Sequence, residues 1–279
     1  MLRIGMAPSE TKWQPSMGLM SYAELSHRQL YEGKIDLTRY AGYLYSEKMD
    51  GWHVVWDGSA NLYTKSGTTT LPAPKEFKAM LPRGVPISAE LVLKNRQASD
   101  VARLRNAKNV AMWRDARLYA FDLPADRTSP FEARTARLKK VVAKQCATYT
   151  TSKCPLRYIA QHKIAPGQRG VASFLKHFED IVTCRGAKST RCPGEGVVVT
   201  APKSLYTPGR ADLKTRFKLK RRQDSEARVV DHVFDKDGLG KSLLVEFNGL
   251  KFRLGIGFTQ KQRANMRPYF PKGSMVTFS

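Results

Sequence analysis

A lysine and a carboxylate interrupt an apolar, aromatic segment near the start of the chain. Lys48, Asp50 and Gly51 lie within residues 43–58, whose alternation predicts two β-strands joined by a tight corner. A lysine at a strand end can act as a nucleophile when its surroundings depress its pKa. A lysine beside a turn is more often a solvated charge. Lys48 alone therefore does not decide between catalysis and an ordinary surface position.

Further residues of these chemical types occupy strand positions later in the chain. Glu90 interrupts the apolar segment "VPISAELVL", Asp122 follows "LYAF", and Glu195 precedes "GVVV". Lys218 and Lys220 alternate in "RFKLK", which predicts that both lie on one face of a strand. That face is either solvated or turned into a basic pocket. Each feature is ordinary by itself, and only their combination indicates a site.

The elements that would position these residues form a mixed α and β pattern. Strands are predicted at residues 85–93 and 117–124, with a helix between them that begins at Ser99 or Asp100. Ser129 offers an N-cap for the next helix, with Pro130 at its first position and Glu132 completing a capping box. Residues 171–183 are amphipathic and predict another helix.

The pattern changes after residue 222. Residues 226–278 contain short strands separated by turns rich in Gly, Asp and Asn, with one helical stretch at 259–268. Such a series predicts a small barrel of the OB-fold type. The predicted division is a flexible arm at 1–18, a large domain at 19–222 and a small domain at 223–279.

The charge of the chain is strongly positive and unevenly distributed. The 279 residues carry a net charge of +24, and residues 139–222 hold 19 Lys or Arg against 4 Asp or Glu. Such an excess favours contact with a phosphate backbone over a solvated basic face. A membrane surface is the competing partner, but the sequence has no apolar run near 18 residues, so we expect no membrane association.

The cysteines and the N-terminus bear on the compartment. Cys146, Cys154, Cys184 and Cys192 form two C-x7-C pairs, which differ from the C-x2-C pattern of zinc sites. We expect free thiols in a reducing compartment, with zinc or disulfides as alternatives. Residues 1–18 lack the apolar region of a secretory signal. An intracellular location, in a viral, nuclear or organellar DNA compartment, is therefore favoured over the periplasm.

The order of these motifs resembles the covalent nucleotidyltransferases. The quoted matches are "SEKMDG", "TKSG", "SAELV", "YAFD", "PFEAR", "GEGVVV", "YTPGR", "FKLK" and "FRLGIGF", which together span about residues 36–278. The chain is most similar to ATP-dependent DNA ligases, in particular the minimal ligases of the bacterial periplasmic type and the small viral ones. This resemblance implies an α+β fold, with an adenylation domain of antiparallel sheets and flanking helices followed by an OB-fold barrel.

The resemblance also implies roles for individual residues. Lys48 would attack the α-phosphate of ATP, with Asp50 as a further catalytic residue, and Lys218 and Lys220 would hold the phosphate. Glu195 and Asp50 would position Mg²⁺ or Mn²⁺. The implied nucleotide-binding set is Glu47, Lys48, His53, Lys65, Glu90, Phe121, Glu195, Lys218 and Lys220, with Phe121 stacking on adenine and Glu90 bonding the ribose. The implied DNA-binding set is Lys65, Arg210, Lys214, Arg216, Arg221 and Arg222.

The sequence departs from the family pattern at three points. His53 replaces an arginine in the first motif, and Lys65 replaces the arginine of a "T-R-x-G" element. Neither substitute provides a bidentate ionic contact. The third departure is that no "RFPSF-x-R" motif, which orients pyrophosphate, follows "GSMVTF". We therefore expect an incomplete chain whose barrel lacks its last strand. The alternatives are that another basic residue substitutes for the motif or that self-adenylylation is impaired. Arg134 in "PFEAR" is interpreted as structural, tying down the strand of Phe121 and Asp122.

These features predict a monomeric enzyme that seals nicks in duplex DNA during repair or replication. An RNA ligase or a capping-type guanylyltransferase would share the K-x-D-G motif and the lysine pair. A non-catalytic, ligase-like protein that binds DNA through its basic surface is an alternative of a different class.

Overall fold

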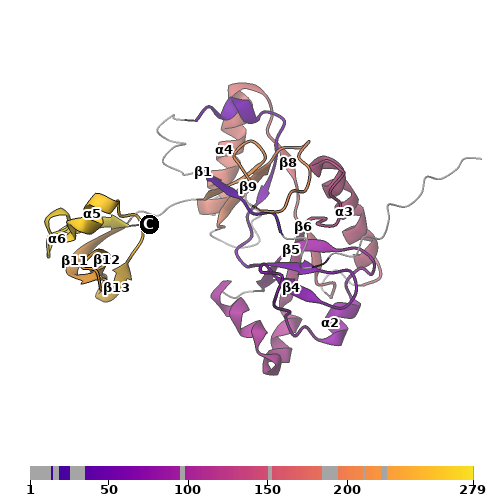
Figure 1. Ribbon diagram of the computed structural model, residues 1–279. Coiled ribbons are helices and arrows are strands. Elements are labelled where there is room, and N and C mark those ends of the chain that lie inside the picture. The colour runs from indigo at the N-terminus through magenta and orange to yellow at the C-terminus, as the bar shows by residue number, and fades with distance from the viewer. Residues whose placement is uncertain are drawn as a thin grey trace, which may run out of the picture. The chain divides into compact units, whose positions relative to one another are not determined.

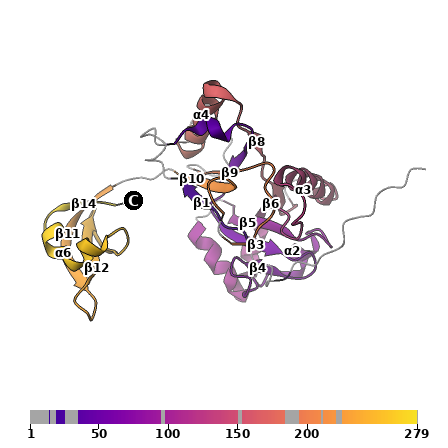
Figure 2. The ribbon, with the colours of Figure 1, turned by 45° about the horizontal axis from the view of Figure 1, so that its top comes forward.

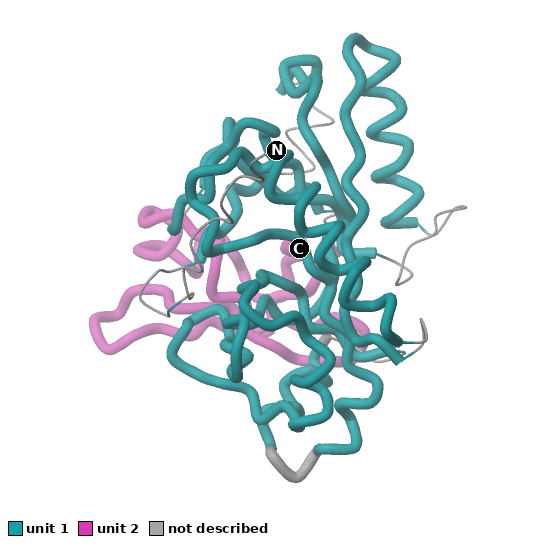
Figure 3. Tube along the Cα trace, turned by 90° about the vertical axis from the view of Figure 1, so that its right-hand side faces the viewer, with its two compact units in different colours: residues 1–221 teal, residues 222–279 magenta. Residues whose placement is uncertain are grey.

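The chain forms two compact units, residues 1–221 and 222–279 (Figure 3). The computed structural model describes residues 14, 19–25, 35–94, 98–149, 153–183, 194–209, 211–220 and 225–278. The predicted arm at 1–18 therefore lies almost wholly outside the described residues.

The first sheet of unit 1 has five strands in the order β1-β10-β9-β2-β8 (Figure 2). Strand β1 pairs in parallel with β10, and the other neighbours are antiparallel. Helix α4 packs on β9 and on the 3-10 helix η2, and its Phe174 and Phe178 are buried with Val197 and Phe217. The bounds are β1 Ala23–Leu25, η2 Leu37–Tyr40, β2 Leu44–Glu47, β8 His162–Lys163, α4 Gly167–Thr183, β9 Gly196–Thr200 and β10 Arg216–Lys220.

The second sheet of unit 1 also has five strands, in the order β4-β3-β5-β6-β7 (Figure 1). Its neighbours are antiparallel except β6 and β7, which are parallel. Helix α3 packs on β6 and β7 and buries Leu138 and Val142 against them. The bounds are β3 Trp52–Trp56, β4 Leu62–Thr64, α2 Lys75–Ala79, β5 Ile87–Leu93, β6 Ala116–Asp122, α3 Phe131–Cys146 and β7 Leu156–Tyr158.

Two predicted helices differ from the observed ones. Residues 99–115 form two 3-10 helices, η3 Ala98–Arg105 and η4 Ala107–Arg114, separated by a turn in which the Asn106 N–H donates to the Arg103 carbonyl at 3.1 Å. Helix α3 begins at Phe131, with Pro130 as N-cap and no side-chain capping bond. Ser129 lies one residue before the N-cap, and its N–H donates to the Asp126 carboxylate at 3.0 Å.

Unit 2 contains the predicted short strands. They form an antiparallel sheet in the order β13-β12-β11-β14 around the buried residues Ala227, Val229, Leu243, Val245 and Met266. Within the described residues this sheet is not a closed barrel. The bounds are β11 Ser225–Phe234, β12 Gly240–Phe247, β13 Leu250–Leu254, α5 Gln260–Ala264, α6 Met266–Tyr269 and β14 Met275–Phe278.

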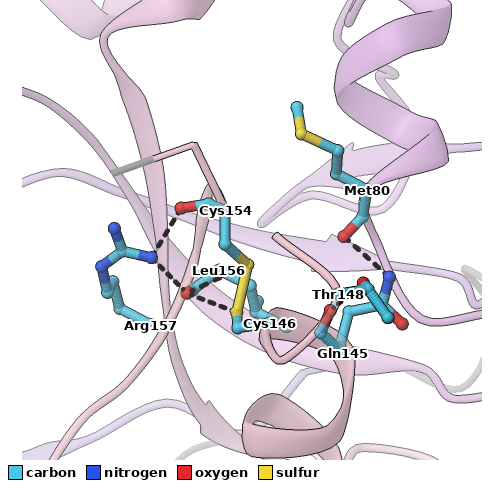
Figure 4. The surroundings of a disulfide bond; sticks show 7 residues. All are labelled: Met80, Gln145, Cys146, Thr148, Cys154, Leu156 and Arg157. Carbon is cyan, nitrogen blue, oxygen red and sulfur yellow. Dashed lines mark hydrogen bonds between the residues drawn. A yellow bond between two sulfur atoms is a disulfide. The ribbon is translucent and has the colours of Figure 1, made fainter. Parts of the chain in front are cut away.

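The expectation of free thiols is wrong for the first cysteine pair. Cys146, at the end of α3, and Cys154, just before β7, form a disulfide with a Cα–Cα distance of 5.5 Å (Figure 4). Arg157 closes the same corner by donating to the carbonyls of Cys154 and Leu156. The C-x7-C spacing here joins a helix to the strand that packs beneath it. The expected reducing compartment therefore loses its support from this pair; Cys184 and Cys192 lie outside the described residues.

Reducing this disulfide should destabilise unit 1. The bond closes a short loop, with a sequence separation of 8 residues. Loop-closure entropy predicts that a Cys146→Ser/Cys154→Ser variant loses about 2–3 kcal/mol of free energy of unfolding. Urea denaturation with and without dithiothreitol measures the loss. The double variant should not respond to the reductant, and an equal response of variant and wild type would contradict the prediction.

Candidate active site

Lys48 lies where the chain crosses from one sheet of unit 1 to the other. Strand β2 belongs to the first sheet and β3 to the second, so residues 48–51 are a crossover and not the corner of a hairpin. The Lys48 N–H donates to the Gly196 carbonyl at 2.8 Å, which anchors the crossover to β9. A Cβ on Gly51 would lie 2.3 Å from the Leu91 carbonyl oxygen. The glycine of K-x-D-G is therefore required by the close approach to β5.

Gly196 serves a similar purpose on the opposite side of the site. Its φ is +143°, and a Cβ there would lie 2.1 Å from the Leu219 carbonyl oxygen of β10. A side chain at this position would force β9 and β10 apart. The glycine thus fixes the position of the preceding Glu195 relative to the lysines of β10.

A pocket in unit 1 collects residues from both sheets. It contains four predicted nucleotide-binding residues, namely Glu47, Lys48, Glu90 and Phe121. Lys48 comes from the crossover, Glu90 from β5 and Phe121 from β6, so the pocket depends on the packing of separate elements. The remaining lining residues are Tyr22, Ser46, Met49, Ile159, Val198 and Arg216.

Glu195 joins the two predicted catalytic strand ends electrostatically. Its carboxylate forms ion pairs with Lys48 through one oxygen and with Lys220 through the other. Burial alone would raise the pKa of Glu195, but Lys48 and Lys220 outweigh burial and hold the pKa below its usual range. The carboxylate is therefore ionised at neutral pH and holds the Lys48 ammonium beside the lysine of β10.

Lys218 has a partner that the sequence did not indicate. Its ammonium lies 2.9 Å from the carboxylate of Glu24, and the two residues face each other in the parallel register of β1 and β10. The pocket residue Tyr22 comes from the same N-terminal segment. Strand β1 has only three residues and pairs with a strand nearly 200 positions later. No local pattern in "AEL" reveals such a pairing.

Glu90 is held in an environment that favours its neutral form. Burial raises its pKa to about 7, aided by the negative charges of Glu195 and Asp50. Lys48 and the Gly51 N–H oppose this shift without cancelling it. Glu90 is thus poised to change charge near neutral pH, beside the lysine that we expect to react.

His53 lies on β3 and carries a neutral imidazole. Burial lowers its pKa to about 3, and the positive charges of Arg216, Lys65 and Lys48 act in the same direction. Its ring lies 5.1 Å from the Phe121 ring in an edge-on arrangement. The Nε2 atom is buried and has no hydrogen-bond partner among the described residues. His53 therefore contributes no charge to the site at neutral pH, and it is not among the residues that line the pocket.

A buried ion pair between Asp122 and Arg134 connects β6, the strand of Phe121, to helix α3. Arg134 donates from Nε to Asp122 Oδ1 at 2.7 Å and from Nη2 to Asp122 Oδ2 at 3.2 Å, and both side chains are fully buried. The remaining Arg134 nitrogen donates to the carbonyls of Ser129 and Ser204. This arrangement agrees with the structural role expected for Arg134.

The predicted DNA-binding residues fall into three groups. Lys65 and Lys214 are exposed, whereas Arg216 is 3% exposed and lines the pocket. Arg210, Arg221 and Arg222 lie outside the described residues. Among the helices of the described part of the chain, none is long and apolar enough to cross a membrane.

The carboxylates of the site can provide some, but not all, of the ligands that a Mg²⁺ ion needs. No group of three or more His, Cys, Asp or Glu side chains gathers in metal-binding geometry within the described residues. Glu195 and Asp50 supply carboxylate oxygens, and both lie near enough to Glu90 to raise its pKa. A Mg²⁺ ion usually keeps several waters and takes substrate phosphates beside one or two carboxylates. The residues present fit that mode of binding.

Comparisons with known proteins place this fold among those of ATP-dependent ligases. Unit 1 has the two sheets of a nucleotidyltransferase fold of the ATP-dependent ligase type, with Lys48 at the crossover and the lysine pair on β10. A Chlorella virus DNA ligase-adenylate structure shares this fold with a TM-score of 0.55 and 18% identity. The alignment covers 94% of this chain and 93% of that one. The expected α+β nucleotidyltransferase fold of antiparallel sheets with flanking helices is thus confirmed. No family model matches the sequence.

Within that class the chain is similar to minimal DNA ligases. A structure from a study of Lig E DNA ligases aligns with a TM-score of 0.71 and 27% identity, covering 94% of this chain and 91% of that one. The DNA ligase of Haemophilus influenzae is 26% identical over 240 residues, which are 85% of this chain and 80% of that protein. The resemblance to minimal ATP-dependent DNA ligases, predicted from the motifs, is confirmed.

The charge state of Glu90 makes a testable prediction about nucleoside binding. If the Glu90 carboxylate accepts hydrogen bonds from the ribose, adenosine should bind more tightly as the pH rises from about 6 to about 8, because the carboxyl loses its proton near its pKa of about 7. Adenosine is the suitable ligand because it carries no phosphate that titrates in this range. Calorimetric titration measures the affinity.

The control is Glu90→Gln, which keeps the shape of the side chain but cannot ionise. His53, with its pKa of about 3, stays neutral across the range and does not contribute. The variant should bind adenosine with an affinity that is independent of pH. A pH dependence that persists unchanged in Glu90→Gln would show that another group controls binding.

Proposed function

We propose that the protein is an ATP-dependent DNA ligase that seals nicks in duplex DNA through a lysyl-AMP intermediate. The observation that carries the proposal is the contact of Glu195 with both Lys48 and Lys220, together with a pocket that Lys48 lines with Glu90 and Phe121. It unites a candidate nucleophile, a phosphate-binding lysine, a ribose-binding carboxylate and a ring for base stacking. These are the parts that transfer of a nucleotide to a lysine needs.

The first step is an attack on ATP. The Lys48 Nζ forms a bond to the α-phosphorus, the bond from that phosphorus to the β-phosphate oxygen breaks, and pyrophosphate leaves. The attacking amine must first lose its ammonium proton. Lys218 and Lys220 stabilise the charge that develops on the phosphate oxygens. A bound Mg²⁺ would supply further charge stabilisation.

Three ion pairs must be exchanged when ATP enters. Lys218 is paired with Glu24, and Lys48 and Lys220 are both paired with Glu195. In our proposal the phosphate replaces these carboxylates as partner of the β10 lysines. Glu195 would then be available, together with Asp50, to hold a Mg²⁺ ion. The Lys48 amine is then released to react.

The remaining steps act on DNA. The 5′-phosphate at a nick attacks the lysyl-AMP, the Lys48–phosphorus bond breaks, and the AMP is joined to the DNA end. The 3′-hydroxyl then attacks that activated 5′-phosphate, the new phosphodiester forms and AMP leaves. The net charge of +24 supports binding of the duplex backbone, and the exposed Lys65 and Lys214 are suited to phosphate contacts.

Labelling the enzyme tests the proposal. Incubation with ATP labelled at the α-phosphate should transfer label to the protein, release pyrophosphate and support sealing of a nicked duplex. Label transferred only from GTP would instead identify a capping-type guanylyltransferase, and sealing restricted to nicked RNA would identify an RNA ligase. Binding to nicked DNA with no covalent label from any nucleotide would identify a non-catalytic, ligase-like protein.

A nick that already carries AMP on its 5′-phosphate separates the steps. The enzyme should seal this substrate without ATP, because only the last step is needed. If it seals this substrate but not an ordinary nick in the presence of ATP, the defect lies in the reaction of Lys48. That outcome would limit the protein to nicks activated beforehand.

A further inference from the structure

Arg216 continues the row of cations on β10 into the interior of the pocket. Arg216, Lys218 and Lys220 alternate along the strand and therefore share one face. At about 3.3 Å per residue, Arg216 lies about 13 Å along the strand from Lys220. If the two lysines hold the α-phosphate, Arg216 lies toward the end of the pocket that contains Phe121, where the base would stack.

The guanidinium of Arg216 is buried among aromatic rings. The side chain is 3% exposed, and its guanidinium carbon lies 5.1 Å from the Tyr22 ring centroid, 5.6 Å from that of Phe121 and 5.4 Å from that of Phe131. Such contacts stabilise a cation but accept none of its five N–H groups in a strong hydrogen bond.

The ionic compensation of this buried cation is incomplete. Its ion pair is with Asp122, at 3.5 Å from Nη1 to Oδ2, and the same carboxylate already receives the shorter bonds of Arg134. The Nε atom is buried and has no hydrogen-bond partner among the described residues. A buried donor without an acceptor is unfavourable, and a ligand that supplies the acceptor would remove this cost.

We propose that Arg216 recognises the base by donating a hydrogen bond to a ring nitrogen of the bound purine. The inference rests on the proposed function, because it requires the nucleotide to occupy this pocket. Adenine offers the acceptors N1, N3 and N7, and a base stacked on Phe121 would present one of them to the guanidinium. Arg216 thus belongs to nucleotide recognition and not to the DNA-binding set in which the sequence placed it.

Analogues of ATP that lack one ring nitrogen test this inference. Wild-type protein should lose about tenfold or more in affinity for one of 1-deaza-, 3-deaza- and 7-deaza-ATP, since a hydrogen bond to a charged donor is worth about 1.5–3 kcal/mol. Arg216→Met should bind ATP about as weakly as wild type binds that analogue. The variant should also lose the discrimination between ATP and the analogue.

Several outcomes would overturn the inference. If the wild-type protein binds all three analogues as tightly as ATP, it does not recognise a ring nitrogen. This result would be obtained without any variant. Equal losses for ATP and for every analogue in Arg216→Met would show a structural role only. Arg216→Lys keeps the charge and provides a second variant should Arg216→Met fail to fold, and it should show reduced discrimination.

The failure of this inference is distinguishable from that of the proposed function. Absence of covalent label from any nucleotide would defeat the ligase proposal itself. Labelling from ATP with discrimination between analogues that does not depend on Arg216 would leave the ligase proposal intact and remove only the role of Arg216. Far-ultraviolet circular dichroism reports whether each variant is correctly folded.

Discussion

Replacing Lys48 by arginine should reduce formation of the labelled enzyme by on the order of a thousandfold or more, because the variant lacks the amine that attacks ATP. Arginine is a sharper choice than alanine. It keeps a positive charge that can pair with Glu195, so the electrostatic contact that links the crossover to Lys220 can persist. The guanidinium stays protonated and cannot act as the nucleophile. The measurement is transfer of α-labelled phosphate from ATP to the protein.

Two controls give this result its meaning. Lys176→Ala changes an exposed lysine of α4 that is paired with Asp180, and it should label as well as wild type. Lys48→Arg should still seal a nick that already carries AMP, although more slowly than wild type, since the final step does not use the amine as nucleophile. Labelling of Lys48→Arg at the wild-type rate would show that another residue carries the nucleotide.

The candidate site could be predicted largely because its residues interrupt regular patterns. Glu90 breaks an apolar strand, and Lys218 and Lys220 alternate on β10, so each stands out from its own neighbours. Their order along the chain then carried the resemblance. The partner of Lys218 could not be predicted in this way, because Glu24 reaches it through a parallel pairing of two distant strands.

The crossover at Lys48 could not be predicted from the local sequence. The alternation of residues 43–58 correctly predicts two strands, but alternation does not say which sheet a strand joins. That choice depends on β9 pairing with β2 and on β5 pairing with β3, both of which are long-range contacts. For this reason the sequence did not show that the two strands belong to different sheets. The crossover places Lys48 against β9 and Gly51 against β5.

The disulfide and Arg216 illustrate a second limit. Spacing alone did not distinguish a disulfide from free thiols, because the deciding fact is that α3 packs against β7 and brings Cys146 to Cys154. Arg216 looked like one more member of a basic run that extends from residue 210 to 222. Its burial follows from its place on the inner face of β10, which only the packing of the two sheets reveals.

Breaking the buried pair beneath the pocket should have the largest effect on stability. Arg134→Met removes a guanidinium whose partner Asp122 is fully buried, and it leaves that carboxylate with Arg216 at 3.5 Å. Loss of one member of a buried ion pair typically costs about 3–5 kcal/mol, because the other charge remains without full compensation. Urea denaturation followed by tryptophan fluorescence measures the loss in unit 1, since all four tryptophans lie within residues 1–221.

A second substitution separates two contributions to the lost free energy of unfolding, namely the uncompensated charge of Asp122 and the lost packing of Arg134. Replacing a buried ion pair by apolar residues is often nearly neutral, so Arg134→Met/Asp122→Leu would recover most of the stability if the two residues formed an isolated pair. Here recovery should be only partial, because the double variant also deprives Arg216 of its carboxylate. Full recovery would mean that Asp122 contributes nothing to holding Arg216. No recovery at all would mean that packing of the Arg134 side chain, and not its charge, stabilises the strand of Phe121.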